Sequence, residues 1–310
     1  MDSRRRLRAA TVVLALLALL PAGCQSGVPS ATPSVSATPA SRDFTLPGAA
    51  KAEIDELMGA AGSRDLIMVQ VAREAVSISV LTGADTPLTW AYRDGKVEQV
   101  ASDLAYVDQA TFDIDDFDIS DVGRLFRTAA VQSDSEKNQT LQIVDYSGGQ
   151  VMMTVTTNPE SRTVFFNPDG SLLETLDFQT LDGLTKGLQE VVGVRTLAYS
   201  VGVKSSLGVW VDFPALSAKS VTRRQRTAKV PATTIARSET TSLPLISVAD
   251  IDPETIWEVA QRTIRRHDLA SDQEWSVEID DREQLGTPRM YFSVGGVSLE
   301  TDLAGHEINS

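Results

Sequence analysis

Residues 66–81 read LIMVQVAREAVSISVL, and this stretch decides the class of fold. Apolar side chains recur at every second position in two successive runs, Ile67, Val69 and Val71, then Val76, Ile78 and Val80. A period of two is typical of a β-strand that buries one face. Because the runs follow one another directly instead of alternating with helices, we expect an antiparallel sheet in an α+β fold.

Amphipathic helices are predicted on either side of such strands. Apolar residues with helical spacing are Ile54, Leu57, Met58 and Ala61 in the first half of the chain, and Leu184, Leu188, Val191 and Val192 in the second. A further helix begins after Asp252, which is a suitable N-cap and is followed by Pro253 at the first helical position. Its counterpart in the first half carries Val122, Leu125 and Phe126.

The order of elements repeats along the chain. Residues 88–97 align with 221–230 at an offset of 133, and residues 167–170 align with 302–305 at an offset of 135. We therefore predict two duplicated modules, residues 44–178 and 179–310. Each is expected to run helix, antiparallel meander, helix, antiparallel meander, with the helices packed on one face of the sheet.

Over residues 44–308, this order of helices and strands resembles the small repeats of PepSY-type and β-lactamase-inhibitor-like exported bacterial proteins. The resemblance lies in element order and strand rhythm, without a diagnostic motif. It implies a non-catalytic module that binds a protein or peptide on a face of its sheet.

Residues 1–23 have the layout of an export signal. Arg4, Arg5, Arg6 and Arg8 make the start positive, and the uncharged apolar run 9–20 that follows is shorter than a membrane-spanning helix requires. A transmembrane anchor is therefore the weaker interpretation. Residues 3–7 partly resemble a twin-arginine export signal, so the general and the twin-arginine routes both stay open.

The signal ends in Leu20-Pro21-Ala22-Gly23-Cys24, which resembles the signals of bacterial lipoproteins, although Pro21 stands where those signals prefer leucine. The resemblance implies cleavage between Gly23 and Cys24, fatty-acid (palmitate-type) modification of Cys24, and attachment to the outer face of the cell membrane. Cys24 is the only cysteine, so it has no intramolecular disulfide partner. The alternative is an ordinary secretory signal with an incidental cysteine.

The segment 24–43 is predicted to be a tether. Ten of the 18 residues from Gln25 to Arg42 are Ser, Thr or Pro, a composition that does not build a core. As a flexible coil it has a root-mean-square reach of about 20–25 Å.

The mature chain is acidic. The whole sequence carries a net charge of −14, and removal of residues 1–23 takes away four arginines and one aspartate, which leaves −17. Such a balance argues against nucleic-acid binding and against electrostatic adhesion to anionic lipid.

No catalytic, metal or cofactor motif is predicted. The two histidines, His267 and His306, lack neighbouring ligands, and residues 113–121, although rich in aspartate, fail the spacing of a calcium loop. We interpret that segment as a strand with Phe112, Ile114, Phe117 and Ile119 inward and its acids outward.

One basic segment stands out on the acidic background. Arg223, Arg224, Arg226 and Lys229 lie within a few residues and are candidates for contact with an acidic partner, although solvated loop charge is the simpler interpretation.

Three functions remain open from the sequence. The first is a membrane-anchored envelope protein that binds a protein or peptide without catalysis. The second is a carrier of an apolar ligand or lipid. The third is a hydrolase whose carboxylates come from distant segments of the chain.

Overall fold

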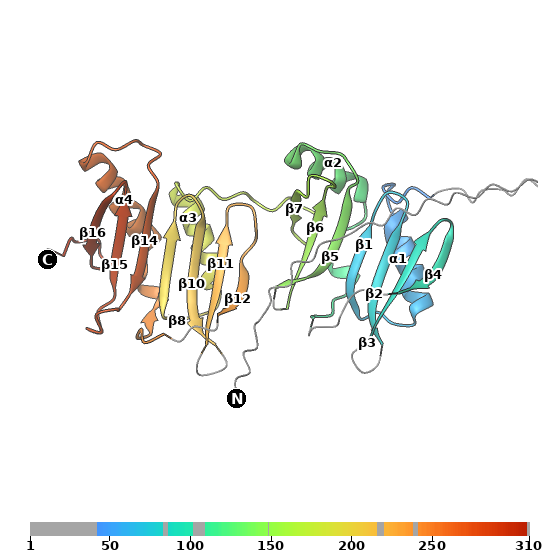
Figure 1. The fold of residues 1–310 in the computed structure, drawn as a ribbon, viewed down its shortest axis with the longest axis horizontal. Helices are drawn as coiled ribbons and strands as arrows, with labels where there is room; N and C mark the ends of the chain where they lie inside the picture. Colours follow the sequence, from blue (N-terminus) through green and yellow to red (C-terminus); the bar gives the residue numbers. More distant parts are fainter. Residues whose placement is uncertain are drawn as a thin grey trace, which may run out of the picture. The chain divides into compact units, whose positions relative to one another are not determined.

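The computed structural model describes residues 42–82, 86–101, 109–147, 149–215, 220–237 and 241–308. Within these residues the chain forms four α-helices and two seven-stranded antiparallel sheets (Figure 1). The predicted α+β class with antiparallel sheets is confirmed. The signal, Cys24 and nearly all of the tether lie outside the described residues.

The first sheet is built from the N-terminal half of the fold, residues 42–173. Its strands run in the order β4-β3-β2-β1-β5-β6-β7, so that β1 and β5 pair at the centre. The elements are α1 (Ala49–Ala61), β1 (Leu66–Val71), β2 (Val76–Thr82), β3 (Thr86–Arg93), β4 (Lys96–Val100), the 3₁₀ turn η1 (Ile114–Asp116), α2 (Val122–Ser133), β5 (Thr140–Ser147), β6 (Gln150–Thr156) and β7 (Thr163–Phe166).

The second sheet is built from the C-terminal half, residues 174–308, in the order β12-β11-β10-β9-β14-β15-β16. A short ribbon of β8 and β13 accompanies it. The elements are α3 (Leu181–Val192), β8 (Leu197–Ala198), β9 (Ser200–Lys204), β10 (Gly208–Pro214), β11 (Val221–Thr227), β12 (Thr233–Arg237), β13 (Ile246–Ser247), the 3₁₀ turn η2 (Val248–Asp250), α4 (Pro253–Arg266), β14 (Trp275–Asp280), β15 (Arg289–Val294) and β16 (Val297–Thr301).

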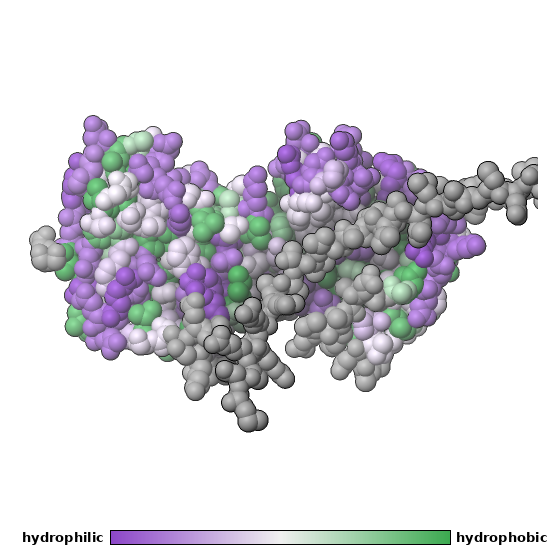
Figure 2. Space-filling view, in the orientation of Figure 1, coloured by the Kyte–Doolittle hydropathy of each residue, from purple (hydrophilic) through white to green (hydrophobic). Residues whose placement is uncertain are grey.

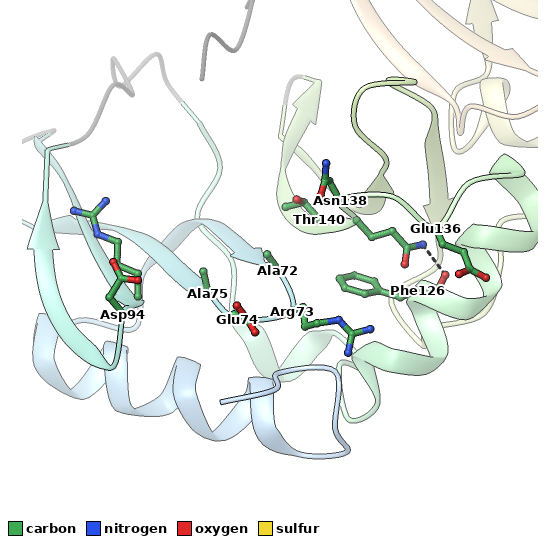
Figure 3. A pocket seen from close by; sticks show the side chains of 11 residues that line it. Ala72, Arg73, Glu74, Ala75, Asp94, Phe126, Glu136, Asn138 and Thr140 are labelled. Carbon is green, nitrogen blue, oxygen red and sulfur yellow. Dashed lines mark hydrogen bonds between the residues drawn. The ribbon is translucent and has the colours of Figure 1, made fainter. Parts of the chain in front are cut away.

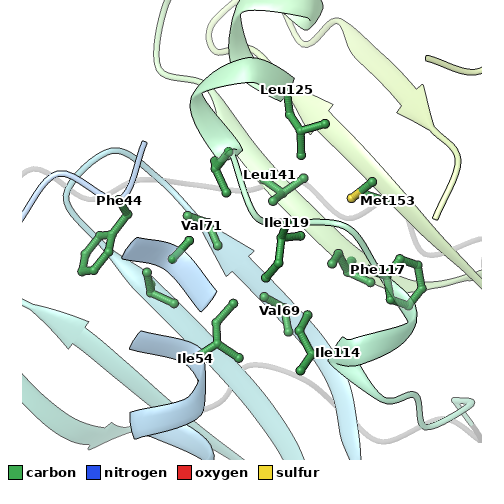
Figure 4. Packing of buried hydrophobic residues seen from close by; sticks show 14 of the residues in the cluster. Phe44, Ile54, Val69, Val71, Ile114, Phe117, Ile119, Leu125, Leu141 and Met153 are labelled. Carbon is green, nitrogen blue, oxygen red and sulfur yellow. The ribbon is translucent and has the colours of Figure 1, made fainter. Parts of the chain in front are cut away.

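Each sheet buries the face that carries its helices. In the first half, Val69 of β1 lies opposite Ile78 of β2, and both are fully buried. Ile54 of α1 and Leu125 of α2 reach the same apolar cluster (Figure 4). A separate cluster fills the second half, from Leu176 to Val294. Burial of each such side chain stabilises the fold by about 1.5–3 kcal/mol.

The helix starts follow local side-chain chemistry. The Asp252 carboxylate accepts hydrogen bonds from the amides of Glu254 (3.1 Å) and Thr255 (3.2 Å), and Pro253 occupies the first turn of α4, as predicted. Thr180 caps α3 through the amide of Gly183 (3.1 Å).

The acidic segment 113–119 turns apolar side chains inward as expected, but its backbone folds differently. Ile114, Phe117 and Ile119 are at most 9% exposed, whereas the backbone forms the 3₁₀ turn η1 and not the predicted strand. The Asp113 carboxylate accepts a hydrogen bond from the amide of Asp115 (3.0 Å), and this local bond competes with sheet pairing. Among the described residues no cluster of His, Cys, Asp or Glu has the arrangement needed to hold a metal.

Two further observations bear on the surface. No helix in the described ranges is long and apolar enough to cross a membrane. On the face shown in Figure 2, hydrophobic side chains gather in small separate patches among hydrophilic ones.

Replacement of Ile54 tests the core of the first half. Ile54→Ala removes a fully buried side chain, so we expect the free energy of unfolding to fall by about 2–5 kcal/mol in chemical denaturation. Val131→Ala, at a position 80% exposed on α2, is the control and should change it by less than about 0.5 kcal/mol. Equal effects would contradict the assigned packing.

Candidate functional site

A groove opens at one end of the first sheet, where three separate segments meet (Figure 3). These are the β1–β2 turn (residues 72–75), the β3–β4 turn at Arg93 and Asp94, and residues 136–140 between α2 and β5. Its volume is about 610 Å³. The antiparallel register brings these segments together, since Val71 pairs with both Val76 and Leu141.

The floor of the groove is apolar and fixed. Phe126 of α2 is 6% exposed, and its carbonyl oxygen accepts a hydrogen bond from the Gln139 side-chain amide at 2.7 Å (Figure 3). Ala72 and Ala75 close the β1–β2 turn through a backbone hydrogen bond of 2.8 Å. The floor therefore needs little rearrangement to receive a ligand.

The rim carries an excess of negative charge. Glu74, Asp94 and Glu136 are exposed, and none of their carboxylates has an ion pair with another residue of the described ranges. The two arginines of the rim are engaged, since Arg73 pairs with Asp43 (2.8 Å) and Arg93 with Glu98 (2.7 Å). Basic groups of a ligand would find three carboxylates available.

The β3–β4 turn holds Asp94 at the rim. Asp94 and Gly95 both adopt positive φ, at 52° and 79°. Two successive left-handed residues are the geometry of a tight two-residue hairpin, for which Asp-Gly is a preferred sequence. The position of this carboxylate is thus set by the turn.

The groove adjoins the first described residues of the chain. The amide of Phe44 donates to the carbonyl of Arg73 (2.8 Å), and hydrogen bonds from Thr45, with the Arg73 charge, lower the pKa of Asp43. Arg42 forms an ion pair with the buried Glu53 and stacks over the Tyr92 ring at 4.8 Å. The N-terminal end of the described residues therefore lies beside the groove.

Glu53, the ion-pair partner of Arg42, is buried and only partly hydrogen-bonded. Its side chain is 1% exposed and one of its oxygens, Oε1, has no hydrogen-bond partner in the described part of the chain. Burial raises the pKa of this carboxyl, while the Arg42 charge opposes the rise.

The four basic residues considered for contact with an acidic partner do not share one exposed face. Alternation along β11 places Arg223 and Arg224 on opposite faces of the sheet. Arg223 binds Asp212 through two hydrogen bonds (2.8 and 2.7 Å), and the Arg224 Nε donates to the carbonyl of Glu190 (3.1 Å). Of the four candidates, only Lys229 lies exposed beyond the strand.

Arg226 is fully buried, which excludes it from a surface contact in this fold. Its guanidinium binds the Glu190 carboxylate (2.7 Å) and the carbonyls of Thr227, Val230 (2.8 Å) and Glu174 (2.8 Å). It ties α3 to β11 and to the segment that opens the C-terminal half. The sequence shows that these residues are charged, whereas the face of the sheet on which each one lies depends on strand register.

The two histidines lie at a helix end and in a turn. His267 is the C-cap of α4, and His306 is exposed in a turn with its Nδ1 3.0 Å from the Asp302 carboxylate. Gly23 and Cys24 lie outside the described residues, so cleavage and lipidation stay predictions.

Sequence reasoning missed the groove. Glu74, Asp94 and Glu136 are ordinary loop acids 20 and 42 residues apart along the chain. The Asp94-Gly95 pair is typical of a tight turn, but it does not indicate which segments will face that turn.

Comparisons with known proteins add no functional information. No protein family and no curated protein matches the sequence. A structural match is the Helicobacter pylori beta clamp bound to a DNA ligase peptide, with a TM-score of 0.16 and 11% identity over 84% of this chain and 67% of that chain. Similarity at this level supports no inference about fold or function.

A pair of substitutions tests the assignment of the basic segment. Arg226→Ala removes four hydrogen bonds and leaves a cavity at a fully buried position, so we expect the free energy of unfolding to fall by about 2–5 kcal/mol. Lys229→Ala should change it by less than about 0.5 kcal/mol. Chemical denaturation of both variants measures the difference, and similar values would show that Arg226 is not the buried tie described above.

Proposed function

We propose that this chain is a lipid-anchored protein on the extracytoplasmic face of the cell membrane that binds a protein or peptide partner without catalysis. The export signal, the lone Cys24 and the Ser/Thr/Pro-rich tether support the anchor. The folded body begins at a well-defined junction, where Arg42 and Phe44 pack against Tyr92.

We also propose that residues 44–178 and 179–310 are duplicated modules. In both, the sheet order places the fourth strand at one edge and the last strand at the other. The 3₁₀ turns η1 and η2 precede the second helix of each half at an offset of 134 residues. Gly170 and Gly305, 135 residues apart, both adopt positive φ in the turn that follows the last strand.

The groove of Figure 3 is the proposed binding site, and its three available carboxylates are the observation that carries the proposal. A partner segment with lysine or arginine side chains would gain attraction from Glu74, Asp94 and Glu136. The apolar floor at Phe126 would take an uncharged side chain between them. The open, charged rim favours such a segment over an apolar ligand or lipid.

Neutralisation of the rim tests this site. We expect the triple variant Glu74→Gln, Asp94→Asn, Glu136→Gln to bind a fluorescent lysine-rich octapeptide about tenfold more weakly than the unmodified mature protein, because three attractive charges are lost. Fluorescence anisotropy at low and raised salt is the measurement, and salt should weaken binding to the unmodified protein.

The matched control removes three charges elsewhere. Glu258, Asp268 and Asp272 are exposed acids of the C-terminal half, and the variant Glu258→Gln, Asp268→Asn, Asp272→Asn has the same net charge as the groove variant. Equal losses in the two triple variants would mean that total charge, and not the groove, governs binding. Retained binding in the groove variant would refute the site.

Metabolic labelling tests the anchor independently. Cells that express the full chain and are fed a fatty-acid analogue should label the unmodified protein and not Cys24→Ala. Equal labelling of both proteins would exclude Cys24 as the lipidated residue.

A further inference from the structure

The second sheet ends in β16, and the described residues pair with only part of the outer edge of this strand. β16 pairs with β15 on one side. On its other side the chain turns at Gly305 and returns, so that the amide of Ile308 donates to the carbonyl of Glu300 (2.9 Å) and Glu307 forms a bridge with Thr301. The return segment thus covers the Glu300–Thr301 end of the strand and leaves the Val297–Leu299 end uncovered by any described residue.

Ser298 presents its backbone to this open edge. In an antiparallel strand, the amide and carbonyl of one residue point to the same side, and residues two apart point alike. Since the Glu300 carbonyl points away from β15, the N–H and C=O of Ser298 also point away from it. No described residue is hydrogen-bonded to either group.

A groove of about 530 Å³ runs beside this edge. Leu299 and Phe292 line it from the side of the sheet that carries the helices, and Tyr291 and Glu300 line it from the opposite side. Side chains of an added strand, which alternate between two faces, would meet an apolar surface on one face and a polar surface on the other.

In the first half of the chain, a return segment also pairs with the last strand of the sheet. The amide of Leu173 donates to the carbonyl of Phe165 (3.0 Å), and Leu172 forms a bridge with Phe166 of β7. Each of these four residues lies 135 positions before its counterpart at β16. The chain itself therefore uses edge pairing at both last strands, and at both the described residues pair with part of the strand.

Charge selects the kind of occupant at β16. On the face opposite the helices, Glu283 and Glu300 both pair with Arg289, so two carboxylates face one guanidinium group, while Glu307 on the helix-bearing face pairs with Arg266. A second copy of β16 would bring more carboxylates to the same place, which opposes pairing between copies. A segment with basic side chains would instead complete the balance.

We propose that the open edge of β16 accepts an extended segment of a partner protein, with alternating apolar and basic side chains, as an added β-strand. The Ser298 N–H and C=O form the first backbone hydrogen bonds with it, Leu299 receives an apolar side chain, and Glu300 receives a basic one. This site is distinct from the groove of Figure 3 in the other half of the chain. The proposal for β16 does not depend on the proposal for that groove.

The test uses the intact mature protein and an end-blocked hexapeptide of alternating lysine and valine as the probe. We expect the peptide to slow hydrogen exchange of the Ser298 amide at least tenfold in nuclear magnetic resonance spectra. Ser298→Pro removes the donor at a position where an edge strand tolerates proline, and it should weaken binding at least tenfold. Ser298→Ala keeps the N–H and should bind like the unmodified protein.

A second probe covers the case in which Ser298→Pro fails to fold. The same hexapeptide with N-methylated lysine backbone amides keeps its charges and side chains but lacks the N–H groups that face β16 in antiparallel pairing, because the residues opposite Ser298 lie on the Glu300 face. It should bind the unmodified protein at least tenfold more weakly. Equal affinity of the two peptides would overturn the proposal, as would an unchanged Ser298 exchange rate. The triple groove variant should bind the hexapeptide at β16 normally, as followed by Ser298 exchange, and loss of that protection would also overturn the proposal.

Discussion

Burial of one face of each sheet is the constraint on which this structure depends. Alternate side chains of every central strand must reach the same apolar cluster, and a shift in register by one residue would turn them to solvent. Val69 opposite Ile78, and Val203 opposite Val209, meet this requirement in the two halves. The register of the strands also determines where each turn and each strand end lies.

The two candidate binding places follow from the open ends and edges that such sheets leave. The groove of Figure 3 lies at a sheet end because the β1–β2 and β3–β4 turns and the start of β5 arrive there together. The β16 site lies at a sheet edge where the described return segment pairs with only the Glu300–Thr301 end of the strand. The charged residues of both places lie outside the apolar clusters, whereas Phe126 and Phe292, which line them, belong to those clusters.

Arg226 and Glu53 illustrate how the fold uses charges inside. The Arg226 guanidinium donates four hydrogen bonds, one to a carboxylate and three to carbonyl oxygens, and so occupies most of its five N–H donors at a fully buried position. Glu53 has Arg42 as its partner and keeps one oxygen without a hydrogen bond in the described part of the chain. The first links α3 to β11, and the second holds Arg42, the first described residue, against α1.

The sequence by itself determined the class of fold, the order of its elements and the start of α4, because these depend on local periodicity and on capping within a few residues. It did not determine that residues 114–116 form a 3₁₀ turn, where a local aspartate bond outweighed strand periodicity. It also left open which face each arginine of β11 occupies and which loop acids meet at the groove. Only the tertiary structure decided these, because strand pairing joins residues far apart in the chain, and contacts at that distance leave no pattern in the local sequence.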